Sequence, residues 1–435
     1  MRLKEIIRNK WTKCIFWALL YTLWVIWLGN FWWLFGLVVI FDIFITKKVH
    51  WNFWKKRYKE GEKPAAWNEW LDAVIFAVIV VTFINTFWFQ AFKIPSSSME
   101  SSLLTGDHLF VSKLTYGPRV PQTPLTIPFT HNTIFGKESY STLIQNDYRR
   151  LKGFRDVERG DVVVFCFPHG DTILRAAPAE DYHTLVRFYG KEKVEEISEI
   201  VSRPSDKKDH YVKRCVALPG DSLEVRNGFV WVNGEQQEIY KGVQLTYQVK
   251  TSGQRINSKT LENLGLNLSE LYFDATLPGY PAMPLTAAML EEVKTLPNVE
   301  SIECQLDTDP SRCSLEIFPF TEDSGWTRDF FGPLWIPQKG ETVKLTEANL
   351  PLYQRIISVY EESDLQSAIE AGEYTFKQDY YFMIGDNRHN SLDSRYWGFV
   401  PEDHIVGKPV VIWLSTDKAR QFPSNIRWGR FMKFL

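Results

Sequence analysis

Two long apolar runs near the N-terminus constrain the fold of this chain more than any other feature. The first covers residues 14–46 and has Asp42 as its only charge. As one helix it would measure roughly 50 Å, against a hydrocarbon core of about 30 Å. Gly29-Asn30 is a turn signal near its middle, so the run predicts two short spans, 12–28 and 31–46, that form a hairpin. Because each arm is short for a full crossing, a re-entrant or interfacial hairpin stays open as the alternative.

The second run, residues 73–89, contains no charge and predicts a third membrane span, with a buried core helix as the alternative. Basic segments at 1–11 and 47–63 flank the hairpin, and the positive-inside rule assigns both to the cytoplasm. The third span would then carry everything after about residue 91 to the outer side of the membrane. A cleaved signal peptide fits poorly, because the first run is too long and no small-x-small site follows it.

Charge and tryptophan are distributed unevenly along the 435 residues. Net charge is -2, but residues 1–66 carry 12 Lys and Arg against 4 Asp and Glu, so the rest carries about -10. Ten of the 17 Trp lie within residues 1–70, and Trp beside Lys and Arg around apolar runs is typical of membrane interfaces. The composition therefore predicts lipid as a partner of the N-terminal part and provides no global basic field for nucleic acid.

The chain after residue 91 is expected to be mainly β. Strand patterns occur at 162–167, 223–234 and 409–414, and Asn227-Gly228 lies between alternating apolar residues, where it indicates a tight hairpin turn. We expect an anchor at 1–90, a catalytic β domain formed by 91–240 and 379–435, and an inserted β-rich subdomain at 241–378.

Four ordered blocks carry the chemical signal. They read FKIPSSSMESSLLTGDHLFVSKLTYG (92–117), VERGDVVVF (157–165), YVKRCVALPGDSLEV (211–225) and FMIGDNRHNSLDSRYWGFVPEDHIVG (382–407). Together they resemble type I signal peptidases, the membrane-anchored Ser/Lys proteases that remove signal peptides from exported preproteins. The resemblance implies secretory preproteins as substrates, a multi-pass protein of the cytoplasmic membrane with its catalytic domain outside, and no metal or cofactor.

By this resemblance Ser98 is the candidate nucleophile, because Ser98-Met99 matches the Ser-x-Met position of the family. Ser96 matches the residue whose hydroxyl forms the oxyanion hole together with the backbone N–H of Ser98. The family usually continues Pro-Thr-Leu two residues past the Met, whereas this chain has Ser101-Ser102-Leu103. The missing proline could loosen the turn without touching Ser98.

Lys213 matches the general base of the family. An unperturbed lysine with a pKa near 10.4 is only about 0.1% neutral at pH 7.5, so its pKa must be depressed for this role. Apolar neighbours on an expected strand would provide the burial that does so. Most lysines in such patterns are surface residues whose stems cover apolar area, and it is the resemblance that favours the catalytic interpretation.

The resemblance also assigns supporting and substrate-binding residues. Ser391 matches the hydroxyl that orients the lysine amine, Asp393 and Arg395 match a supporting ion pair, and Gly385 and Asp386 match the opening turn of that block. Three apolar residues match the lining of the pockets for the substrate's -1 and -3 side chains: Ile94, Leu103 and Val212. The alternative interpretation is that they are ordinary core residues.

Two further features depart from the family or stand outside it. His389 replaces an Asp of the block and raises the possibility of a histidine base, which we disfavour because Lys213 already occupies the base position. Cys304 and Cys313 lie nine positions apart in a polar stretch, and we expect them to form a disulfide.

Two alternative functions are disfavoured. The apolar membrane runs disfavour a self-cleaving Ser/Lys regulator, and the joint presence of Ser98, Lys213 and Ser391 disfavours a noncatalytic membrane-anchored scaffold.

Overall fold

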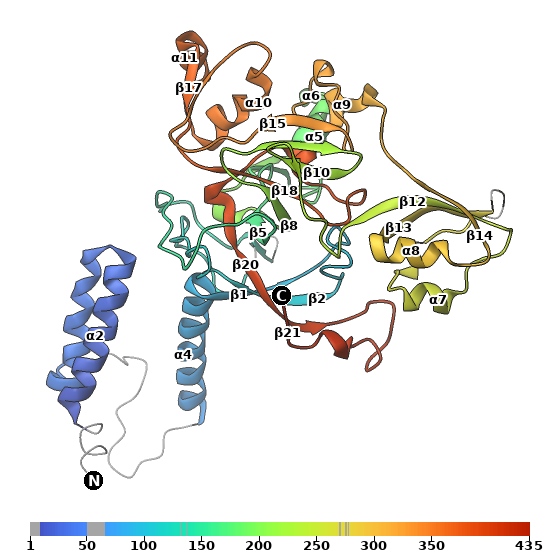
Figure 1. Cartoon of the computed structure of the whole chain (residues 1–435). Coiled ribbons are helices and arrows are strands. Elements are labelled where there is room, and N and C mark those ends of the chain that lie inside the picture. Colours follow the sequence, from blue (N-terminus) through green and yellow to red (C-terminus); the bar gives the residue numbers. More distant parts are fainter. Residues whose placement is uncertain are drawn as a thin grey trace.

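A computed structural model describes residues 9–49, 66–130, 132–135, 137–268, 271–274, 276 and 278–435. Most of the basic flanks expected at 1–11 and 47–63 therefore lies outside the described residues. Figure 1 shows two separate helical elements, the hairpin that begins with α2 and the single helix α4, below a larger and mainly β body.

The hairpin turns where the sequence predicts. α2 (Lys10–Leu28) begins after Asn9, whose side chain accepts a hydrogen bond from the Trp11 N–H, and it ends at Gly29, which has a φ of 63°. The second arm is irregular: a 3₁₀ turn at Phe31–Phe35, a short helix α3 at Gly36–Phe41 and a π-helical turn at Asp42–Thr46. Among the described residues, two helices are long and apolar enough to cross a membrane, α2 and α4 (Ala66–Phe87), whereas the second arm is shorter.

α4 begins seven residues before the expected span and ends two residues earlier. Its last residue is Phe87, and strand β1 (Phe89–Lys93) starts almost at once. The change to strand is fixed by the Lys113 N–H, which donates to the Trp88 carbonyl at 2.8 Å. α4 consequently leads directly into the main sheet.

The main sheet is antiparallel throughout, with the order β1-β2-β20-β5-β8-β18-β19 and β21 paired to β20. Its remaining strands are β2 (Asp107–Ser112), β5 (Val162–Cys166), β8 (His210–Ala217), β18 (Tyr380–Ile384), β19 (Val400–Pro401), β20 (Ile405–Ser415) and β21 (Lys433–Phe434). The strands expected at 162–167 and 409–414 are β5 and part of β20, and the mainly β prediction is confirmed.

A second sheet has the order β11-β10-β9-β15. Its strands are β9 (Ser222–Arg226), β10 (Phe229–Val232), β11 (Glu235–Gln236) and β15 (Phe331–Trp335). The predicted hairpin turn is present, with positive φ at both Asn227 (53°) and Gly228 (78°). Phe382 of β18 and Leu223 of β9 share one buried core, which joins the two sheets.

A third sheet, β13-β12-β14, has a hydrophobic core of its own and lies to the right in Figure 1. It consists of β12 (Gln244–Thr251), β13 (Gly279–Thr286) and β14 (Val299–Cys304), with α7 (Ser258–Asn263) and α8 (Ala287–Lys294). The short elements elsewhere are β3 (Thr133–Ile134), β4 (Lys137–Glu138), β6 (Thr172–Leu174), β7 (Ile200–Ser202), β16 (Thr342–Lys344), β17 (Glu373–Thr375), α5 (Tyr182–Tyr189), α6 (Lys191–Ile197), α9 (Cys313–Glu316), α10 (Leu350–Arg355), α11 (Leu365–Ala371) and α12 (Ser394–Trp397).

The expected disulfide between Cys304 and Cys313 is not formed, and that prediction is wrong. Both residues are free thiols. Cys304 is exposed at the end of β14, whereas Cys313 is buried in the core beneath the main and second sheets, where its Sγ donates to the Thr321 carbonyl at 3.3 Å. The two cysteines therefore belong to different parts of the fold despite their short spacing.

Candidate active site

The candidate nucleophile lies in the turn between β1 and β2. Ser98 is 8% exposed, and the turn is closed by the Leu103 N–H, which donates to the Met99 carbonyl at 2.7 Å. Met99 and Leu103 are buried in one cluster with Ile94 and Val164. Apolar packing on one side of the turn thus holds the serine at the edge of the main sheet.

The candidate base comes from the middle of that sheet. Lys213 lies on β8 opposite Val163 of β5, and its Nζ is 2.5 Å from Ser98 Oγ. The side chain is 4% exposed. Burial lowers the pKa of Lys213 to about 8, and the nearby Asp393 carboxylate limits the decrease. The structure therefore joins a buried amine that readily loses its proton to a serine hydroxyl.

The segment that follows β18 holds the backbone of the serine turn. The Asn387 N–H donates to the Ser98 carbonyl at 3.1 Å, and Asn387 Nδ2 donates to the Ser97 carbonyl at 3.1 Å. Gly385 has no room for a side chain, because a Cβ there would lie 2.6 Å from the Ser98 carbonyl oxygen and 2.2 Å from Ser391 Oγ. Sequence reasoning missed Asn387, although it lies inside the quoted block.

Ser391 is brought to this site but does not hydrogen-bond to the lysine. Its hydroxyl is buried, and no described residue meets the geometry of a hydrogen bond to it. It lies near enough to Asp393 to help keep the pKa of that carboxylate low, an effect that does not require ideal hydrogen-bond geometry. Ser391 Oγ is thus available to a new partner.

Two buried ion pairs support the segment. Asp393 accepts from Arg395 Nε at 2.9 Å and Nη2 at 2.8 Å, and it also accepts the Gly385 N–H at 3.1 Å. Burial alone would raise the pKa of Asp393, but Arg395 and these hydrogen bonds lower it. Asp386 similarly accepts two bonds from Arg214, at 2.8 and 2.5 Å. Each carboxylate is paired with a guanidinium, which is the condition for burying both charges.

The expected oxyanion donors lie beside the nucleophile. Ser96 is exposed, with its Oγ 3.4 Å from Ser98 Oγ. Within the described part of the chain, the Ser98 N–H has no hydrogen-bond acceptor. The Ser98 N–H is therefore free to donate to an incoming oxygen, and the Ser96 hydroxyl lies beside the nucleophile.

The departure from proline at residue 101 has a conformational reason. Ser101 has a φ of 68°, a value that the ring of proline excludes. Its hydroxyl accepts a hydrogen bond from Gln244 Nε2 at 2.8 Å, and the Ser102 hydroxyl donates to Asp386 at 2.5 Å. The serines thus attach the turn to β12 and to the Asp386 pair, contacts that local sequence patterns did not predict.

The expected substrate-binding residues lie together. Ile94 and Leu103 are buried at 4% and 1% exposure, and Val212 is partly buried against the same cluster. Val212 precedes Lys213 on β8, so this apolar group adjoins the serine and the lysine. Burial of Ile94 and Leu103 is also what ordinary core packing would produce.

Comparison with known proteins identifies the family to which this chain belongs. A family model described as "Signal peptidase, peptidase S26" matches residues 67–269 and 338–414. The chain belongs to the signal peptidase S26 family. It is a serine peptidase, and the blocks that hold Ser98, Lys213 and Ser391 all lie inside the matched ranges.

Several bacterial signal peptidases I of this family are similar over most of their length. The protein of Haemophilus influenzae is 26% identical over 376 residues, which cover 84% of this chain and 74% of that one. The Helicobacter pylori (strain 26695) protein is 25% identical over 379 residues, covering 84% and 91%. The protein of Buchnera aphidicola from Acyrthosiphon pisum is 24% identical over 418 residues, covering 92% and 93%.

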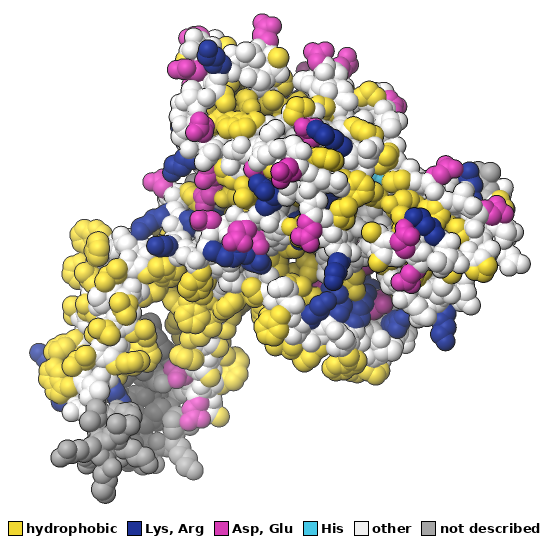
Figure 2. All heavy atoms as spheres, viewed as in Figure 1, with side chains coloured by type: hydrophobic (Ala, Val, Ile, Leu, Met, Phe, Trp, Pro, Cys, Tyr) yellow, Lys and Arg dark blue, Asp and Glu magenta, His cyan; other side chains and the backbone are white. Residues whose placement is uncertain are grey.

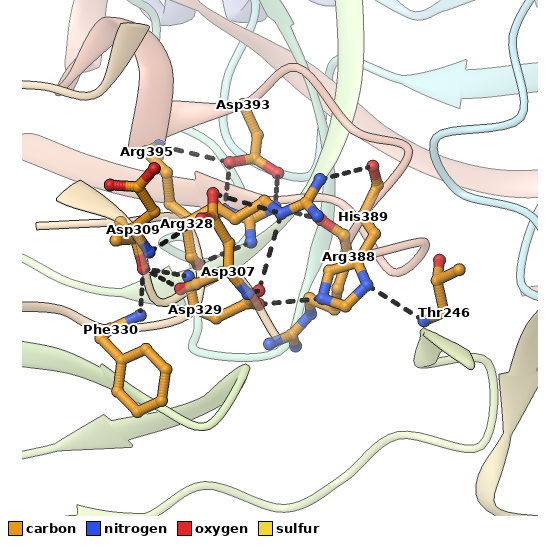
Figure 3. Close-up of polar contacts among 11 residues, drawn as sticks. Thr246, Asp307, Asp309, Arg328, Asp329, Phe330, Arg388, His389, Asp393 and Arg395 are labelled. Carbon is orange, nitrogen blue, oxygen red and sulfur yellow. Dashed lines mark hydrogen bonds and ion pairs between the residues drawn. The ribbon is translucent and has the colours of Figure 1, made fainter. Parts of the chain in front are cut away.

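His389 of this S26 peptidase belongs to a polar network and is not part of the Ser98–Lys213 contact. Figure 3 shows its ring between Thr246 and Asp329. The Thr246 N–H donates to Nδ1 at 3.1 Å, so a neutral ring carries its proton on Nε2, which lies 2.9 Å from Asp329. Both ring nitrogens are thus engaged by residues of 241–378. This network, which also includes Arg388, Arg395 and Arg328, connects the active-site segment to that region (Figure 3).

Proposed function

We propose that this protein is a membrane-bound serine endopeptidase that uses Ser98 and Lys213 to cleave N-terminal signal peptides from exported preproteins. The observation that carries the proposal is the 2.5 Å contact between Lys213 Nζ and Ser98 Oγ in a member of the S26 family. The names of the similar bacterial proteins support signal peptides as the substrate class.

In the proposed reaction, neutral Lys213 accepts the Ser98 hydroxyl proton as Oγ attacks the scissile carbonyl. The Ser98 N–H and the Ser96 hydroxyl stabilise the oxyanion, and donors of this kind contribute roughly 3 kcal/mol each. Protonated Lys213 then gives its proton to the leaving amine, which breaks the peptide bond and leaves an acyl-enzyme on Ser98. Water, deprotonated by Lys213, hydrolyses the ester and restores both residues.

The remaining expected residues keep supporting roles in this proposal. Gly385 allows the close approach of the serine turn, and Ser391 orients the amine once the substrate has tightened the site. Asp386, Asp393 and Arg395 hold the segment in place. Side chains of Ile94, Leu103 and Val212 would line shallow apolar pockets for the small residues before the cleavage site.

We further propose that α2 crosses the cytoplasmic membrane outward, that the second arm of the hairpin returns the chain to the cytoplasmic side, and that α4 crosses outward again, so that residues 92–435 lie outside. α4 has no buried residue, and apolar side chains cover both it and the hairpin in Figure 2, as lipid contact requires. The tip of the hairpin contacts the β body: Arg149 Nη2 donates to the Leu28 carbonyl at 2.6 Å, and Trp27 Nε1 donates to the Lys152 carbonyl at 3.1 Å. A tip on the outer side agrees with a cytoplasmic N-terminus.

Three parts follow from this assignment: an anchor at 1–90, a catalytic domain at 91–240 and 379–435, and an insertion at 241–378. Interruption of the family match between 269 and 338 supports an insertion, although it is narrower than the proposed bounds. Secretory preproteins and lipid are the proposed partners, and no nucleic acid is expected.

One experiment tests substrate and cleavage together. The purified protein is incubated with a secretory preprotein, and the products are mapped by mass. A single cut after the signal peptide is expected.

A second experiment tests the topology. Reporter fusions after residue 120 should give a signal on the outer side of the membrane, and a cytoplasmic signal there would refute the proposed topology.

A further inference from the structure

A cavity of about 410 Å³ lies where α4 meets the segment that follows β2. One wall is a polar face of the last turns of α4: Thr82, Asn85 and Thr86. The opposite wall comes from residues within 119–130 together with Asn132, 206–208 and His210. Figure 1 shows the teal segment after β2 above the end of α4 that leads into β1. Neither Ser98 nor Lys213 lines the cavity, and its wall includes a helix that we assign to the membrane.

Positive charge dominates the wall of this cavity. Four cationic side chains line it, Lys113, Arg119, Lys207 and Lys208, against the single carboxylate of Asp206. That carboxylate is already engaged, since it accepts hydrogen bonds from the N–H and the hydroxyl of Thr123 at 2.9 and 2.7 Å. Arg119 and Lys208 have Asp403 nearby, and Lys207 has Asp206 nearby and donates to Thr126 Oγ1 at 2.8 Å, which leaves Lys113 least compensated.

Lys113 is the clearest unpaired cation. Among the described residues, none forms a hydrogen bond or an ion pair with its Nζ. Burial, with a contribution from the neighbouring Arg119 and Lys207, lowers the pKa of Lys113 to about 7. A bound anion would remove this repulsion and favour the charged amine.

Two neutral groups in the same wall also lack partners. Asn132 Nδ2 and Thr82 Oγ1 are buried, and no described residue hydrogen-bonds to either atom. Buried polar atoms without partners are uncommon and costly, so their occurrence in one cavity indicates a ligand that accepts hydrogen bonds. An amide N–H, a hydroxyl and an ammonium are together suited to phosphate oxygens.

We propose that this cavity binds the phosphate of an acidic phospholipid headgroup. The inference uses the membrane placement of α4 proposed above, which sets the cavity at the depth of the outer headgroups. Ile127 and Phe129, which also line the cavity, are 48% and 64% exposed and would lie beside the acyl chains. Such an apolar rim favours a lipid over free phosphate.

Binding is measured on the purified full-length protein in a neutral detergent by native mass spectrometry. The probes are dioctanoyl phosphatidylglycerol, dioctanoyl phosphatidylcholine and inorganic phosphate. We expect phosphatidylglycerol to bind most tightly and the double variant K113Q/K207Q to bind it about 10- to 30-fold more weakly, given the usual contribution of a lysine near a lipid phosphate. Asn132→Asp, which places a carboxylate in the wall at nearly constant shape, should weaken binding by a similar factor.

The matched control is K418Q/K433Q, which removes two exposed lysines elsewhere and should bind as the wild type does. Signal-peptide cleavage in detergent by K113Q/K207Q should stay within about twofold of wild type, which separates failure of the lipid site from failure of the proposed peptidase mechanism. Equal losses in both double variants would overturn the proposal. Inorganic phosphate binding as tightly as phosphatidylglycerol would overturn the assignment to lipid.

Discussion

The pH dependence of cleavage follows quantitatively from the burial of Lys213. With a pKa of about 8, the amine is about 9% neutral at pH 7 and about 91% neutral at pH 9. Only the neutral amine accepts the serine proton, so kcat/KM should rise about 10-fold between pH 7 and pH 9 and then level off. An unperturbed lysine would instead give a rise of about 100-fold over this interval without a plateau.

The assay measures kcat/KM for a preprotein from pH 6 to pH 10 in detergent. As a control for damage, enzyme held at each pH is returned to pH 8 and assayed again. A midpoint near 8 supports the account, because desolvation is the main cause of the shift. A flat profile, or one still rising steeply at pH 10, would show that Lys213 is not the buried base described here.

Three further perturbations test the site. Lys213→Met should raise the free energy of unfolding by up to about 3 kcal/mol at pH 7 and by little near pH 10.5. The reason is that the unfolded lysine stays protonated above the folded pKa of about 8, so the stability of the wild type rises with pH between that value and the pKa of the unfolded lysine. Thermal unfolding of both proteins at the two pH values checks this, and an equal stabilisation at both would contradict it. Gly385→Ala should lower kcat/KM at least ~100-fold, because the added Cβ would overlap the Ser391 hydroxyl and the Ser98 carbonyl. The control Gly429→Ala adds a Cβ in open space and should leave kcat/KM unchanged. Ser101→Pro should lower turnover at least ~10-fold, whereas Ser101→Gly should lower it little, because of the two only proline excludes the φ of 68°. A fully active Ser101→Pro variant would show that the positive φ at this position is not required for activity.

Local patterns predicted the elements that depend on local chemistry. Gly29-Asn30 ends a helix because glycine accepts positive φ, and Asn227-Gly228 turns a hairpin for the same reason. The continuous apolar run VVVFCF at 162–167 also identified strand β5. The contact between Ser98 and Lys213 could be predicted only from the family resemblance, because 115 residues separate the two in the chain.

Long-range contacts explain what the sequence did not predict. Gln244 bonds to Ser101, and Asp329 lies beside His389, although no spacing rule relates these pairs. The same limit explains the disulfide error: short spacing indicated a pair, yet β14 and the start of α9 face different cores.

The proposed mechanism requires Ser98 and Lys213 to act together in the cleavage of signal peptides. The most direct measurement compares wild type, Ser98→Ala and Lys213→Ala on one purified preprotein, with products mapped by mass and folding checked by thermal unfolding. We expect one cut after the signal peptide by the wild type, and no detectable product from either folded variant. A Lys213→Ala enzyme that cleaves at the same bond with a near-wild-type rate would contradict it.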